Sequence, residues 1–133
     1  MSSDPSDRWR EAADSYSKAC KGIMAMSQSI RYVGVLNRYG RTVAGFIRPG
    51  TRPMLNREQA KNEFFVLSTI LRLSADTEGA IGKLEHILVR HEKIKMALIP
   101  MGNVACMITI DGEEPQYMQI VGDVKAHLNK MSF

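Results

Sequence analysis

The sequence lacks an uninterrupted run of about 18 apolar residues, which is the length that a membrane-spanning helix needs. It also lacks the basic and then apolar start of a secretory signal peptide, because its first residues, MSSDPSDRWREAADS, are polar and acidic. Its 133 residues suit one domain. We therefore expect a cytoplasmic protein without membrane contact, with a disordered N-terminus at residues 1–6 and a single domain at residues 7–133.

Residues that could carry chemistry are scarce. Cys20 and Cys106 lie far apart and form no CxxC pair, so we expect two small buried side chains rather than a disulfide framework or a zinc site. The three histidines do not have the spacing of zinc ligands, and neither a GxSxG elbow nor a set of regularly spaced carboxylates is present. The sequence therefore predicts no catalytic residue, no metal and no cofactor, which favours a non-enzymatic protein.

Four glycines fall within residues 34–50, GVLNRYGRTVAGFIRPG, but this stretch matches neither GxxxxGK[ST] nor GxGxxG. A phosphate-binding loop places its glycines directly before a helix, whereas these lie in and between two predicted strands. We assign Gly40 to a turn and Gly50 to a loop. Gly34 and Gly45 are expected inside strands, where another backbone or a helix packs closely.

Acidic residues are absent from residues 15–57, a segment that carries eight basic ones. The rest of the chain has more acidic than basic residues, so the whole positive excess belongs to this third of the sequence. The candidate partner-binding residues flank a predicted hairpin turn, lie at the opposite end of that hairpin, or follow it in a loop: Arg31, Arg38, Tyr39, Arg41, Arg48 and Arg52.

Three interpretations of this basic hairpin stay open. Charged side chains can simply form a solvated rim that protects an edge strand from aggregation. They can instead attract an acidic protein partner, with Tyr39 filling a pocket of that partner. The surface over residues 31–57 can also bind nucleic acid, although only two tyrosines interleave with the arginines.

Hydrophobic periodicity predicts helices at residues 7–27, 56–75 and 115–128. Asn56 and Gln59 have the spacing of a capping box at the start of the second helix. Segments rich in β-branched residues predict strands at 30–37, 42–48, 84–92, 94–101 and 104–110. The resulting order, α-β-β-α-β-β-β-α, favours an α/β (α+β) fold in which a single five-stranded antiparallel sheet carries helices on both faces.

This order resembles the roadblock/dynein-light-chain and profilin-like group of folds. The runs IRYVGVLNRYGRTVAGFIRPGTRP and IKMALIPMGNVACMITID are also similar to an uncharacterised family of small archaeal proteins, over residues 29–112. The residues that carry this likeness are Ile30-Arg31, Gly34-Val35, Asn37, Gly40-Arg41, Val43-Ala44-Gly45 and Ile99-Pro100. The roadblock resemblance implies a binding module that dimerises and docks partners such as small GTPases.

We therefore predict a non-enzymatic, homodimeric protein-interaction or regulatory module that docks a small GTPase or another acidic protein. Nucleic-acid binding through residues 31–57 is the alternative. A small-molecule sensor is a further alternative, because a sheet with a covering helix can enclose a pocket.

Overall fold

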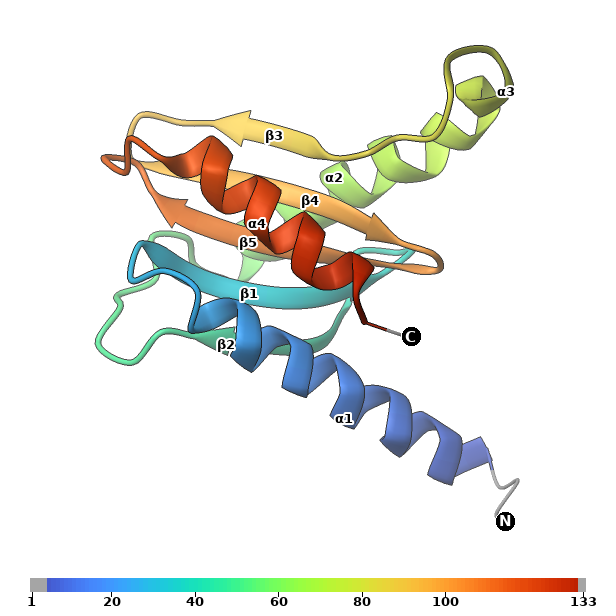
Figure 1. Ribbon diagram of the computed structural model, residues 1–133, viewed down its shortest axis with the longest axis horizontal. Helices are drawn as coiled ribbons and strands as arrows, with labels where there is room; N and C mark the ends of the chain where they lie inside the picture. Colours follow the sequence, from blue (N-terminus) through green and yellow to red (C-terminus); the bar gives the residue numbers. More distant parts are fainter. Residues whose placement is uncertain (1–4, 132–133) are drawn as a thin grey trace.

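One antiparallel sheet organises the chain, with the strand order β2-β1-β5-β4-β3. The computed structural model describes residues 5–131 (Figure 1). The strands are β1 (Ile30–Asn37), β2 (Thr42–Ile47), β3 (Ile87–Arg90), β4 (Ile94–Met101) and β5 (Val104–Asp111). The helices are α1 (Pro5–Met24), α2 (Arg57–Leu73), the 3-10 turn η1 (Ser74–Thr77), α3 (Glu78–Ile81) and α4 (Tyr117–Asn129).

The predicted fold class and element order are confirmed. The structure adds η1 and α3 where the sequence indicated only a break after the second helix. The prediction of a disordered start falls largely on residues 1–4, which lie outside the described residues, while Pro5 and Ser6 belong to α1. None of the helices in the described part of the chain is long and apolar enough to cross a membrane.

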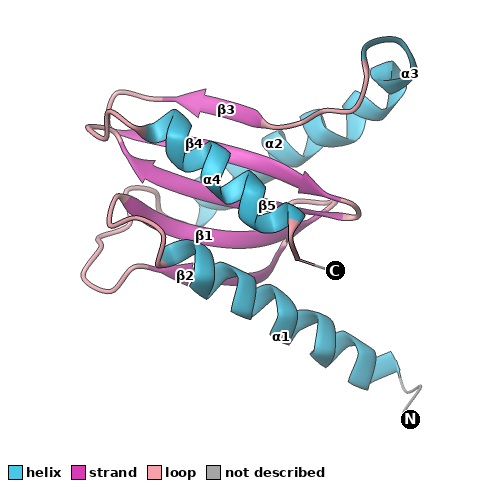
Figure 2. Cartoon of the chain, in the orientation of Figure 1, coloured by secondary structure: helices cyan, strands magenta, loops and turns pink. Residues whose placement is uncertain are grey.

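The two faces of the sheet are covered unequally. Helices α1 and α4 lie on one face and α2 lies on the other (Figures 1 and 2). The larger core fills the space under α1 and α4, with residues such as Ile23, Ile108 and Val124 fully buried. A smaller core under α2 centres on Leu67 and Met107. The prediction of a sheet covered on both faces is therefore confirmed, with a single helix α2 on the second face.

The β1–β2 turn is fixed both by its own hydrogen bonds and by α2. The side-chain oxygen of Asn37 accepts from the backbone N–H groups of Tyr39 and Arg41, at 2.9 and 3.1 Å. Gly40 has a φ of 81°, and a Cβ there would lie 2.9 Å from the carbonyl oxygen of Phe64 on α2. The expected turn is confirmed, and glycine is required because the backbone of α2 leaves no space for a side chain.

Tyr32 explains the two glycines inside the first hairpin. Gly34 and Gly45 are direct cross-strand partners, and the Tyr32 side chain lies over both. A Cβ at Gly34 would overlap the Tyr32 hydroxyl oxygen, and one at Gly45 would lie 2.8 Å from it. The Tyr32 ring also stacks on Phe64 of α2, with 6.0 Å between the ring centroids. The expected close approach is confirmed, but the neighbour is a side chain rather than a backbone or a helix.

Helix α2 starts where the sequence indicated. The N–H of Gln59 donates to the side-chain oxygen of Asn56 at 2.8 Å, and the N–H of Asn56 donates to the Gln59 side chain at 3.0 Å, which completes the capping box. The spacing of apolar residues in this helix also predicts Ile70 on the inner face together with Leu67 and Leu71. This prediction is wrong, because Ile70 is 46% exposed and the inner face is a narrow stripe centred on Leu67 and Leu71.

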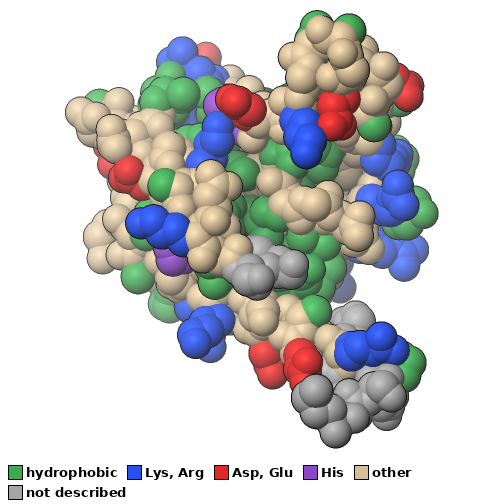
Figure 3. All heavy atoms as spheres, turned by 45° about the vertical axis from the view of Figure 1, so that its right-hand side comes forward, with side chains coloured by type: hydrophobic (Ala, Val, Ile, Leu, Met, Phe, Trp, Pro, Cys, Tyr) green, Lys and Arg blue, Asp and Glu red, His purple; other side chains and the backbone are tan. Residues whose placement is uncertain are grey.

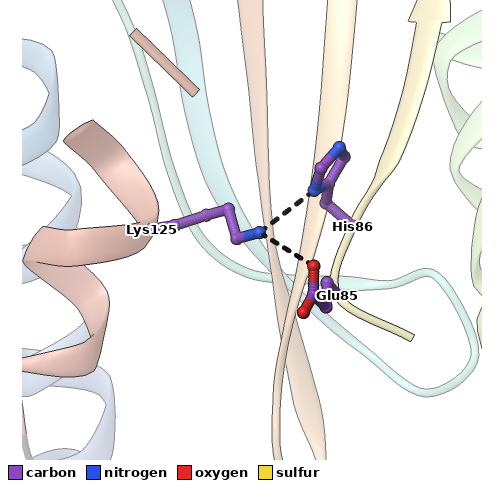
Figure 4. A network of polar contacts seen from close by, with 3 residues as sticks. All are labelled: Glu85, His86 and Lys125. Atoms are coloured by element: carbon purple, nitrogen blue, oxygen red, sulfur yellow. Dashed lines mark hydrogen bonds and ion pairs between the residues drawn. The ribbon is translucent and has the colours of Figure 1, made fainter. Parts of the chain in front are cut away.

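The edge strand β3 is shorter than the predicted segment 84–92. Pairing with β4 begins at Ile87, and the residues before it lie beside α4. The Lys125 ammonium on α4 lies 3.2 Å from Nδ1 of His86 and 3.8 Å from a carboxylate oxygen of Glu85 (Figure 4). These polar contacts connect the segment that leads into β3 to the helix α4.

Candidate functional site

Tyr39 forms the tip of the β1–β2 turn and is 61% exposed. The guanidinium carbons of Arg38 and Arg72 lie 6.0 and 5.7 Å from its ring centroid, which is the range of cation–π contacts. Arg72 on α2 also donates to the backbone carbonyl of Arg38 at 2.7 Å. We call Arg38, Tyr39, Arg41 and Arg72 the tyrosine rim. It presents an aromatic ring in contact with two cations, one from the turn and one from α2.

A basic groove of about 890 Å³ adjoins the tyrosine rim, between the β1–β2 turn and α2. Arg41, Arg57 and Lys61 line it, and none of the described lining residues is acidic. In Figure 3, lysine and arginine side chains gather along the right-hand edge of the molecule. The groove and the rim share Tyr39 and Arg41, and together they hold basic side chains around an exposed aromatic ring.

The other predicted residues lie at the opposite end of the hairpin. Arg38 follows Arg31 by seven positions along and just past β1, which corresponds to about 23 Å of extended chain. Arg31 donates to the backbone carbonyl of Arg52 at 2.9 Å, so it holds the loop after β2. The six predicted residues therefore form two groups rather than one patch. Only Arg38, Tyr39 and Arg41 are brought together at the turn.

Arg48 is used inside the protein. Its guanidinium donates to the carbonyls of Met24, Ser27 and Ile30, at 2.6, 2.6 and 2.7 Å. These carbonyls come from the end of α1, the following loop and the start of β1. Arg48 thus fastens α1 to the sheet. Its role depends on carbonyls that only the folded chain brings together, and for this reason the sequence does not distinguish it from the other arginines.

Both cysteines are buried, as predicted. Burial raises the pKa of the Cys20 thiol to about 11 and raises the pKa of the Cys106 thiol further. Both groups therefore stay protonated at neutral pH and are poor nucleophiles. Within residues 5–131, no group of three or more His, Cys, Asp or Glu side chains is placed to hold a metal ion.

A second candidate surface runs along the outer face of α2. Its residues follow a three-and-four spacing, which places them on one face of the helix. We call this set the α2 stripe: Gln59, Asn62, Val66, Thr69 and Leu73. Val66 and Leu73 are 53% and 62% exposed, and Ile70 lies beside them. The stripe carries no charge. Its spacing is visible in the sequence, but our prediction followed only the inner face of this helix.

No protein-family model and no curated protein matches the sequence. Solved structures do match. A gliding protein MglB from Thermus thermophilus has a TM-score of 0.67 at 10% identity, with 87% of each chain covered. A roadblock/LC7 domain from Streptomyces avermitilis has a TM-score of 0.64 at 12% identity, with 86% of this chain and 91% of that chain covered. An MglB solved in a tetrameric arrangement has a TM-score of 0.63 at 12% identity, with 98% and 86% covered.

These matches show that the chain has the fold of roadblock/LC7 domains. The roadblock-type fold that the element order implied is therefore confirmed. The resemblance to a family of small archaeal proteins stays a prediction.

The backbone contacts of Arg48 and the exposed position of Arg41 predict different effects on the free energy of unfolding. Arg48→Met deletes hydrogen bonds to three backbone carbonyls, so we expect the free energy of unfolding to fall by about 2 kcal/mol or more. Arg41→Met removes an exposed guanidinium and should change the free energy of unfolding by less than about 0.5 kcal/mol. Urea unfolding followed by circular dichroism measures both. Equal losses in the two variants would show that Arg48 does not fasten α1.

Proposed function

We propose that this protein is a non-enzymatic interaction module that forms a homodimer through the α2 stripe and docks an acidic protein on the tyrosine rim. The observation that carries the proposal is the uncharged, largely exposed α2 stripe with its apolar residues Val66 and Leu73. The exposed apolar side chains in or beside this stripe, Val66, Ile70 and Leu73, mark an interaction surface. The three-and-four spacing suits another α-helix, which is what a second copy of the chain supplies.

The charges beside the stripe favour an antiparallel pair. A two-fold axis near Val66 would place this residue against its own copy and Gln59 against Leu73 of the other chain. The same register brings Glu58, in the first turn of α2, toward Arg72 in the last turn of the partner helix. Opposite charges would then meet at both ends of the contact. A two-fold interface needs such a self-complementary surface.

The fold neighbours agree with self-association, since one of the matched MglB structures is described in a tetrameric arrangement. That arrangement belongs to MglB. For this chain it supports the proposal only through the common fold. The roadblock resemblance also makes a small GTPase the protein partner we propose first.

The tyrosine rim has the chemistry to receive an acidic partner. Exposed arginines steer a negatively charged protein toward the surface, and a central aromatic side chain serves as an anchor. Tyr39 is already positioned by Arg38 and Arg72, so less conformational freedom is lost when it is covered.

The dimer is tested by light scattering on the wild type, Val66→Asp and Met118→Asp at about 50 µM, a concentration at which a dissociation constant in the low micromolar range gives mostly dimer. We expect twice the mass of one chain for the wild type and a single-chain mass for Val66→Asp, because two aspartates would face each other. Met118 is an equally exposed apolar residue on α4, so Met118→Asp should stay dimeric. A monomeric wild type would contradict the dimer.

The acidic partner is tested by calorimetric titration with purified small GTPases of the source organism. Arg38→Glu/Arg41→Glu should weaken binding by at least about tenfold, because charge complementarity is reversed at the tyrosine rim. Lys83→Glu/Lys130→Glu makes the same change in net charge elsewhere and should bind as the wild type does. Tight, salt-sensitive binding of a single-stranded RNA or duplex DNA, with no GTPase bound, would instead support the nucleic-acid alternative.

A further inference from the structure

A largely apolar cavity of about 640 Å³ lies under the N-terminal half of α2. Its floor is a continuous cross-strand row on the sheet, in the order Ile47, Tyr32, Thr109 and Met96. Its walls are the first two turns of α2 and the loop between β2 and α2. The cavity therefore lies on the inner side of α2, away from the α2 stripe.

Hydrogen-bonded elements hold this cavity open. Tyr32 is folded along the hairpin over Gly34 and Gly45, so its ring stacks on Phe64 at the end of the cavity instead of filling it. Arg31 holds the loop through the carbonyl of Arg52. The capping box at Asn56 fixes where α2 begins. The hollow is thus built into the fold, and its volume is that of a small-molecule site.

The lining combines apolar side chains with two cationic ones. Ile47, Met96 and the loop residue Met54 offer apolar contact, and methionine side chains adapt to ligand shape. The charged residues Arg31 and Arg57 also line the cavity. Glu63 is the one acidic residue among the described lining residues, so positive charge prevails. A ligand that fits this pattern has a hydrocarbon body and a single anionic group.

We propose that the cavity binds a medium- or long-chain carboxylic acid, with its hydrocarbon chain over the Ile47–Met96 row and its carboxylate at Arg57 and Arg31. A guanidinium matches the geometry of a carboxylate and forms strong charge-assisted hydrogen bonds with it. Arg31 already donates one N–H to the loop, which keeps its guanidinium in place. Burial of the hydrocarbon chain supplies the remaining affinity. This site makes the protein a sensor of an amphipathic anion in addition to its proposed docking role.

The site is tested by isothermal titration calorimetry with two ligands. One is laurate, and the other is dodecyltrimethylammonium, which has the same chain length and the opposite charge. We expect saturable binding of one laurate per chain and no binding of the cation. Arg57→Gln should weaken laurate binding by about tenfold, the loss of one charge-assisted contact. Ala60→Trp places an indole in the cavity from the α2 wall and should abolish binding, while circular dichroism confirms that the variant is folded.

Val66→Asp changes only the outer face of α2 and should bind laurate as the wild type does, so this test is separate from that of the dimer. Three results would overturn the proposal. They are no saturable binding of laurate up to about 1 mM, equal binding by folded Ala60→Trp, or equal affinity for dodecyltrimethylammonium.

Discussion

A single helix, α2, covers one face of the five-stranded sheet. Neighbouring strands lie about 4.8 Å apart, so the sheet is about 20 Å wide, whereas a helix with its side chains is about 10 Å across. Helix α2 therefore covers the centre of its face, over buried residues such as Leu36 and Met107. The cavity lies where the N-terminal half of this single helix leaves part of the sheet surface unfilled.

Three features of the molecule meet on α2. Its inner side is positioned by Gly40 in the β1–β2 turn and by the stack of Phe64 on Tyr32. Its outer side carries the α2 stripe. Its last turn supplies Arg72, which holds Tyr39 in the tyrosine rim. The proposed dimer contact, the proposed partner surface and the wall of the cavity therefore share one helix, and Arg72 takes part in both the rim and the charged end of the proposed dimer contact.

Much of the fold could be predicted because its signals are local. The capping box at Asn56 and the turn at Gly40 each depend on residues within four positions. The hydrogen-bond partners of the arginines could not be predicted in this way. Arg48 binds carbonyls 18 to 24 positions away, and Arg72 reaches a turn 34 positions away. Sequence marks where positive charge accumulates, but only the folded chain determines which guanidinium faces solvent.

In the proposed dimer, α2 pairs with its own copy through an antiparallel stripe centred near Val66. Oxidative cross-linking of Val66→Cys tests this pairing, since the native Cys20 and Cys106 are buried and do not compete. A two-fold axis near residue 66 predicts a disulfide-linked dimer on a non-reducing gel, while Met118→Cys, at an equally exposed position on α4, stays monomeric. If Val66→Cys cross-links no better than Met118→Cys, α2 does not form this interface.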